Sequence, residues 1–165
     1  DVAFWRIAMR PGRPMAVGRI SMQKNAFSPR QMDKVSSFNG SDNGAHSPGA
    51  ILFGLPGNPV AVMVTFLAFV RPALLQMMGC TAAPAPLLRA RCLEAMRKKP
   101  GRTEYQRGIV SSAPDGTLQV RTTGNQGSGV LSSMVQGNGL IVLHHGQGNV
   151  AIGDEVDVMM FDGVI

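Results

Sequence analysis

Residues 3–20, AFWRIAMRPGRPMAVGRI, form two short and mainly apolar stretches on either side of Pro11 and Gly12. Short apolar stretches bounded by turn residues are typical of β-strands, and a Pro-Gly pair favours a turn. We therefore expect two short strands. In the first, Arg6 and Arg10 would share one face about 13 Å apart, and Arg13 would follow the turn. These arginines would form either a solvated strand face or an anion site.

The next stretch, residues 22–49, has no sustained period and is rich in Ser, Asn, Gly and Pro. This composition is typical of segments that cannot bury enough apolar surface to fold. Structureless loops of more than about 15 residues are uncommon inside a compact domain unless they are functional or disordered. We predict a mobile surface insertion over residues 22–49.

A strand-to-helix junction follows, in the stretch ILFGLPGNPV at 51–60. Residues 50–54 favour a short buried strand. Asn58 is a preferred N-cap residue, and Pro59 suits the first helical position, where a missing N–H costs nothing. Gly57 would let a ligand approach the backbone. The helix start would offer free N–H groups near Val60 and Ala61, so this junction is either an anion site or only a well-capped helix.

The predicted helix runs to Met78 and is apolar nearly all round, with Gly79 as its stop. A helix that is apolar on every side is typically buried between layers. The pair Arg71-Pro72 divides the run well short of the about 20 apolar residues that a bilayer requires. We therefore expect no membrane span.

From Leu88 onward the pattern becomes all-β, after a linker at residues 81–87. About five short strands alternate with turn signals, and Asp115-Gly116 lies between two of them as a strong hairpin signal. The chain therefore favours an α/β part followed by an all-β part that forms a small barrel or sandwich. We place the first domain at 1–80 and the second at 88–165.

The composition adds a net charge of +6, and seven of the Lys and Arg residues lie between positions 89 and 107. Anionic partners are therefore favoured. Nucleic acid is disfavoured, because Tyr105 is the one aromatic residue in that stretch that could stack on a base. Two cysteines are too few for a disulfide framework, and no signal peptide is visible, so a reduced cytoplasmic setting is expected. The chain opens at Asp1, which suggests a piece of something longer.

Four motifs together resemble one known family. GLPGNPV at 54–60, MRPGRPMAVG at 9–18, KKPGRTEYQRG at 98–108 and TTGNQGSG at 122–129 are similar to the C-terminal half of the molybdenum insertases. These include the bacterial MoeA proteins and the E domains of gephyrin and its plant counterpart. The resemblance implies the C-terminal part of a three-layer α/β (MogA-like) domain plus a small β-barrel domain.

The resemblance also implies a reaction and partners. Such proteins transfer molybdate onto adenylylated molybdopterin with Mg²⁺, complete the molybdenum cofactor and release AMP. It implies a homodimer and an upstream half of the α/β domain, without which this fragment would be inactive. The Mg²⁺ ligands would lie outside this chain, because carboxylates are scarce around the motifs. A gephyrin-like scaffold is the alternative, since a Ser/Pro-rich insertion suits an interaction protein.

The residues that the resemblance assigns to substrate binding are of three kinds. Basic anion contacts would come from the first region, a substrate loop from the strand-to-helix junction, and a hydroxyl from the glycine-rich loop of the barrel. They are Arg6, Arg10 and Arg13, then Pro56, Gly57, Asn58 and Pro59, and finally Ser128.

Overall fold

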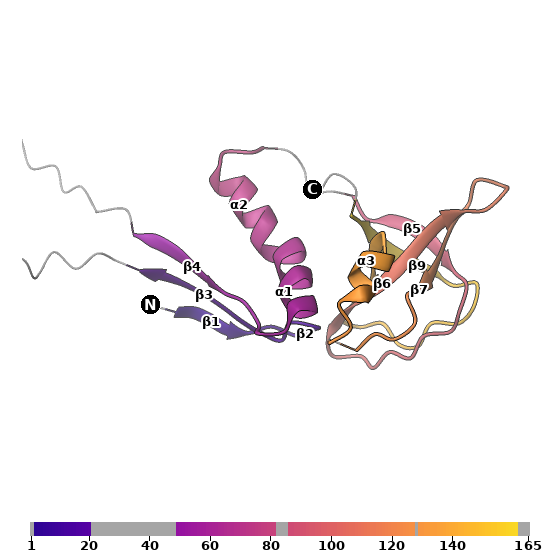
Figure 1. Ribbon diagram of the computed structural model, residues 1–165, viewed down its shortest axis with the longest axis horizontal. Helices are drawn as coiled ribbons and strands as arrows, with labels where there is room; N and C mark the ends of the chain where they lie inside the picture. Colours follow the sequence, from indigo (N-terminus) through magenta and orange to yellow (C-terminus); the bar gives the residue numbers. More distant parts are fainter. Residues whose placement is uncertain (1, 21–48, 82–85, 128, 162–165) are drawn as a thin grey trace, which may run out of the picture.

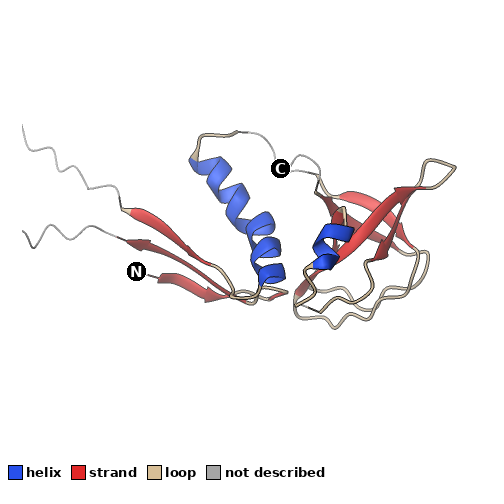
Figure 2. Cartoon of the chain, viewed as in Figure 1, coloured by secondary structure: helices blue, strands red, loops and turns tan. Residues whose placement is uncertain are grey.

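The computed structural model describes residues 2–20, 49–81, 86–127 and 129–161. The predicted insertion over 22–49 therefore lies almost entirely outside the described residues. A small sheet and one long helix come from the first half of the chain, and a barrel comes from the second half (Figure 1, Figure 2).

The first sheet has three strands in the order β1-β3-β4. The strands are β1 (Val2–Arg6), β3 (Pro14–Ile20) and β4 (Ala50–Gly54), and both neighbouring pairs are antiparallel. The register of β3 and β4 places Ile20 opposite Ala50. Ile20 and Ala50, which flank residues 21–49, are therefore neighbours in the sheet.

The first region contains one more strand than its pattern predicts. The backbone leaves the sheet after Arg6, and a two-residue strand, β2 (Met9–Arg10), pairs in parallel with β6 (Thr103–Ser112) of the barrel. The prediction that Arg6 and Arg10 share one strand face is therefore wrong. The cause is long-range, because Met9 and Arg10 pair with Thr103 and Glu104, about a hundred residues further along the chain.

The long helix extends from Pro59 to Met77 in three segments. These are α1 (Pro59–Thr65), a π-helical segment η1 (Phe66–Val70) and α2 (Arg71–Met77). The predicted cap is confirmed, since Asn58 Oδ1 accepts from the backbone N–H groups of Val60 and Ala61. The π segment lies just before Pro72, whose ring would crowd the carbonyl four residues earlier in an ordinary α-helix.

Within this chain the helix is buried on one side, and its other face is uncovered among the described residues. α2 has no buried residue. The buried face of α1 packs against the barrel in a cluster of Met9, Val60, Val64, Met134 and Leu140. By length and composition alone the helix could cross a membrane, a test that core helices of soluble proteins also pass.

Five strands close the predicted barrel in the order β6-β7-β5-β9-β8, with β8 pairing back to β6. The remaining strands are β5 (Leu88–Cys92), β7 (Leu118–Thr122), β8 (Gly139–Leu143) and β9 (Glu155–Met160), and a short helix α3 (Ser132–Gln136) precedes β8. The predicted turn at Asp115-Gly116 joins β6 to β7, with Gly116 at a φ of 83°. The barrel core is apolar, from Ala90 to Val158.

Candidate functional site

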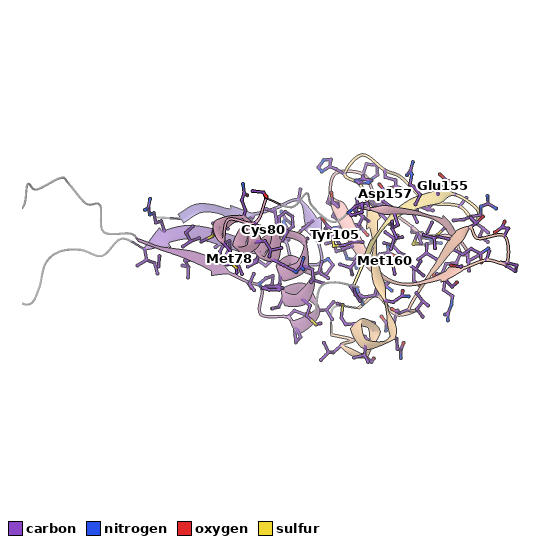
Figure 3. All side chains as sticks on the ribbon, turned by 90° about the horizontal axis from the view of Figure 1, so that it is seen from above. Met78, Cys80, Tyr105, Glu155, Asp157 and Met160 are labelled. Carbon is purple, nitrogen blue, oxygen red and sulfur yellow. The ribbon has the colours of Figure 1, made fainter. Side chains whose placement is uncertain are left out.

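One cleft of about 880 Å³ lies where the first-half turns meet the barrel. Its lining comes from four segments that are far apart in the sequence. These are the turn at residues 7–14, the junction at 56–61, the barrel segment at 97–107, and Gln126. The β2–β6 pairing brings the first and third of these segments side by side (Figure 1). In Figure 3, Tyr105 lies at this meeting place between the helix and the barrel.

The first wall is the Pro-Gly turn that follows β2. The Arg10–Pro11 peptide bond is cis, and Gly12 is buried at a φ of 100°. A Cβ on Gly12 would collide with Thr65 Oγ1 of α1, so the absence of a side chain lets the turn pack directly on the helix. Arg10 and Arg13 flank this buried point, and both line the cleft with exposed side chains.

The second wall is the strand-to-helix junction. Pro56 is buried, whereas Gly57 is exposed, and a Cβ added to Gly57 would meet nothing within 4 Å. Space for a ligand therefore exists beside Gly57. The predicted free N–H groups of Val60 and Ala61 are absent, because Asn58 Oδ1 accepts from both at 3.1 and 3.3 Å. Any anion here would be bound by side chains rather than by these two N–H groups.

The third wall is basic and comes from the barrel. Arg97 and Lys99 are exposed, and Arg102 is half-buried. Arg102 Nε bonds Glu104 Oε1 at 2.8 Å, and Glu104 is the carboxylate of the cleft lining. Six cations, from Arg10 to Arg107, therefore face one carboxylate in the lining. Such a cleft favours a ligand with several negative charges.

Arg107 lies at the back of the cleft and is 1% exposed. Burial, and then the charge of Arg10, lower the pKa of its guanidinium. Tyr105 is half-buried beside it, and burial raises the pKa of that phenol, so Tyr105 is neutral at physiological pH. The cleft floor thus holds a buried cation and a neutral hydroxyl.

The described residues do not fit Mg²⁺. No three His, Cys, Asp or Glu side chains gather anywhere in the described part of the chain. Within the cleft, Glu104 is already bonded to Arg102, and the rest of the charged lining is positive. A hard divalent cation requires several oxygen ligands that carry negative charge. We therefore derive no chemistry through a metal from these residues.

The residues assigned from the sequence fall in different places. Arg10, Arg13, Pro56, Gly57 and Asn58 come together in the cleft. Arg6 is exposed at the end of β1 and Pro59 is exposed at the helix start, and neither lines the cleft. Ser128 lies outside the described residues.

Sequence reasoning missed several polar or charged residues of the lining. Five of them are Arg97, Lys99, Arg102, Arg107 and Gln126. Their signal was present, because KKPGRTEYQRG and TTGNQGSG contain four of them and the charge cluster at 89–107 contains the cations. The cluster alone did not show which cations face the cleft. Lys98, for example, is buried and donates to the Lys99 and Gln147 carbonyls.

Two family models match the chain in tandem. The first is described as "Probable molybdopterin binding domain" and matches residues 1–76. The second is described as "MoeA C-terminal region (domain IV)" and matches residues 89–161. The chain belongs to the MoeA family. The cleft of this MoeA-family chain therefore lies between the two matched regions.

Curated relatives agree with this membership. A molybdopterin molybdenumtransferase of Haemophilus influenzae is 31% identical over 166 residues, which covers 100% of the chain and 34% of the relative. Gephyrin of Dictyostelium discoideum is 27% identical over 96% of the chain and 22% of the relative. The chain thus spans about a third or less of the length of these two relatives.

Solved structures show the same fold. A molybdopterin biosynthesis MoeA protein from Pyrococcus horikoshii has a TM-score of 0.66 at 21% identity, covering 97% of this chain and 32% of that one. A molybdenum cofactor biosynthesis protein from Pyrococcus furiosus has a TM-score of 0.64 at 25% identity, covering 97% and 45%. The predicted α/β part followed by a small barrel is confirmed.

Proposed function

We propose that this MoeA-family chain is the C-terminal portion of a molybdenum insertase. The whole enzyme would transfer molybdate onto adenylylated molybdopterin, complete the molybdenum cofactor and release AMP. The observation that carries the proposal is the cleft, in which six cations from both halves of the chain surround a space of about 880 Å³. Pterin phosphate, AMP phosphate and molybdate are all oxyanions that match this charge.

The cleft residues would bind and orient, not react. Arg10, Arg13 and Arg102 present guanidinium forks, which hold tetrahedral oxyanions through paired hydrogen bonds. Glu104 fixes Arg102 from the barrel side. Gly57 leaves space where a bulky ring system could approach the backbone. Gln126 adds a neutral polar side chain to the wall, and its carboxamide bonds the backbone of Arg107.

The active enzyme would require more than these residues. We infer that the upstream half of the α/β domain, a second subunit and the Mg²⁺ ligands come from outside this chain, so residues 1–165 alone would be inactive. The uncovered side of the helix supports the inference that the other half of the α/β domain comes from outside this chain. Phe66, Phe69, Leu74 and Met77 are exposed there, as are Ile51 and Leu52 on β4. A cytoplasmic setting follows from this reaction.

A gephyrin-like scaffold is a second candidate function. It is favoured by the similarity to gephyrin of Dictyostelium discoideum along 96% of the chain. A scaffold would bind a protein segment through residues 22–49 and would not need the cleft. Pull-downs with and without residues 22–49 test it, because a scaffold loses its partners on deletion and an insertase retains its substrate affinity.

The test of the cleft is substitution of Arg10 by Ala in the full-length polypeptide that contains these residues. Arg10 is exposed, so stability should change little. Affinity for adenylylated molybdopterin should fall about 10- to 100-fold, the scale of a lost charged hydrogen bond. Titrations at two ionic strengths should show that the affinity of Arg10→Ala depends less on salt than that of wild type.

The matched control is Arg121→Ala, an exposed arginine on β7 that does not line the cleft. It removes the same charge and should leave the affinity within about twofold, because its side chain is not part of the cleft lining. Equal affinity of wild type and Arg10→Ala at low salt would remove Arg10 from the substrate site.

A further inference from the structure

Arg107 is a buried cation whose guanidinium is stabilised by neutral hydrogen-bond acceptors. Its side chain is 1% exposed, and none of the ion pairs among the described residues includes it. Nε donates to Ser133 Oγ at 2.8 Å, and Nη2 donates to the carbonyls of Gly127 at 3.0 Å and Asn125 at 3.3 Å. A buried cation is costly unless such acceptors surround it. The acceptors of this side chain therefore all lie within residues 125–133.

The backbone of Arg107 holds the same stretch. Its N–H donates to Gln126 Oε1 at 2.8 Å, and its carbonyl accepts from Gln126 Nε2 at 3.1 Å. The carbonyl also accepts from the N–H of Thr123 at 3.0 Å. β7 ends at Thr122. The carboxamide of Gln126 thus continues the hydrogen-bond pattern of the sheet beyond the last residue of the strand.

The other bonds of this glycine-rich loop, residues 123–127, are local. Gln126 Nε2 reaches Thr123 Oγ1, and the Gly127 N–H donates to Asn125 Oδ1. Gly124, Asn125 and Gly127 are exposed, and Gly124 has a φ of 85°. Local turns of this kind shape a loop without fixing its place on the barrel. Within the described part of the chain, the hydrogen bonds of Arg107 fix that place.

The hydrogen bond to Ser133 links Arg107 to residues that follow the loop. Ser133 Oγ accepts from Arg107 Nε and donates to the carbonyl of Val130 at 2.5 Å. Val130 N–H in turn donates to the Gly127 carbonyl. Arg107 therefore fixes the loop and, through Ser133, the start of the segment that leads into α3.

We propose that Arg107 is a positioning residue that holds the glycine-rich loop against β6, so that Gln126 faces the cleft. It acts through the loop, because Nε and Nη2 are occupied by protein acceptors. The part of this proposal that concerns substrate affinity rests on the proposed function. The part that concerns the loop does not.

The first test is amide hydrogen exchange on Arg107→Met without any ligand. Methionine retains much of the volume and removes the donors. Exchange at Gly127 and Val130 should accelerate about tenfold or more, since bonds to a charged donor are lost. Exchange at Val110 in β6 should remain as in wild type. Unchanged exchange at Gly127 would overturn the proposal.

A second variant keeps the charge. Arg107→Lys leaves a cation that can reach one carbonyl but not the set that the guanidinium fork joins. It should accelerate loop exchange by an intermediate factor and keep the barrel folded. Full protection in Arg107→Lys would mean that charge alone orders the loop, and the proposal of a guanidinium fork would fail. Arg121→Met is the control and should change neither region.

The second test is a double-mutant cycle on affinity for adenylylated molybdopterin, measured in the full-length polypeptide with Arg107→Met, Gln126→Ala and both. If Arg107 acts through the loop, the double variant should lose little more affinity than the worse single variant. Losses that multiply would assign Arg107 to direct binding and overturn the proposal. Wild type that does not bind the substrate would refute the proposed function alone, and the exchange result would still decide the role of Arg107.

Discussion

Gly12 is the residue on which the cationic turn depends. Its φ of 100° is disfavoured for any residue with a side chain, and its Cβ would collide with Thr65 Oγ1, which is fully buried. Thr65 cannot yield easily, because its hydroxyl donates to the Ala61 carbonyl at 2.6 Å inside α1. Arg10 and Arg13 are therefore placed by a residue that carries no chemistry of its own.

We predict that Gly12→Ala destabilises the chain by about 1–3 kcal/mol, the scale of backbone strain. It should also weaken substrate binding, because the turn must move away from α1. Thermal or urea unfolding measures the first effect. The control is Gly57→Ala in the same cleft, where φ is not positive and nothing lies within 4 Å of the added Cβ. Equal destabilisation by both substitutions would contradict the argument.

Local chemistry predicts some residues well and cannot predict others. Asn58 as a cap needs only its own side chain and the next three residues, so the sequence shows it directly. The burial of Arg107 depends on acceptors at Asn125, Gly127 and Ser133, which no local pattern connects to it. The same holds for Arg10, whose strand partner lies in the barrel.

At the scale of elements, strands and turns of the barrel are predictable because each is specified within a few residues. The break between β1 and β2 is not predictable, because Ile7 and Ala8 continue the apolar stretch while the backbone changes sheet. The π-helical segment η1 cannot be predicted from the sequence either. In the sequence, Arg71-Pro72 interrupts an apolar run, whereas in the structure the helix continues through this pair after a wider turn at Phe66–Val70.

The β3–β4 pair leads to a prediction on the segment between them. Because Ile20 lies opposite Ala50, a two-residue Asn-Gly turn can replace residues 21–49. The melting temperature should change by only a few degrees, since loop length contributes about 0.6 kcal/mol per doubling to loop closure. Differential scanning calorimetry of the full-length polypeptide that contains these residues measures it. A loss of cooperative unfolding would mean that residues 21–49 pack into the core.

At the scale of the whole molecule, the two apolar clusters leave one side without a core. Among the described residues, neither cluster includes a residue of β3 or β4. The outer face of the helix exposes Phe66, Phe69 and Leu74, and Met78 is 81% exposed beyond α2 near Cys80 (Figure 3). A surface of this kind is rarely left in water by a soluble protein.

We therefore predict that residues 1–165, expressed alone, associate with themselves or remain poorly soluble. Light scattering coupled to size exclusion measures the mass against the 17.5 kDa of one chain. Replacing Phe66 and Phe69 by Ser should reduce the association, because both lie on the exposed face. Replacing the buried Val64 by Ser should instead disrupt the packing of α1 against the barrel. A soluble monomer of wild type that melts cooperatively would contradict this prediction.

The two-residue strand β2 has a mechanical consequence. The first half of the chain is joined to the barrel twice, once by the covalent connection between α2 and β5 and once by the ladder that links Met9 and Arg10 to Thr103 and Glu104. A body held at two points cannot turn freely about either point, and rotation is left only about the line that joins them. Opening of the cleft would therefore be limited to rotation about that line and to small sliding movements of the packed surfaces. Arg10 and Glu104 lie at one of the two joints, so the spacing between them would change least when the cleft opens.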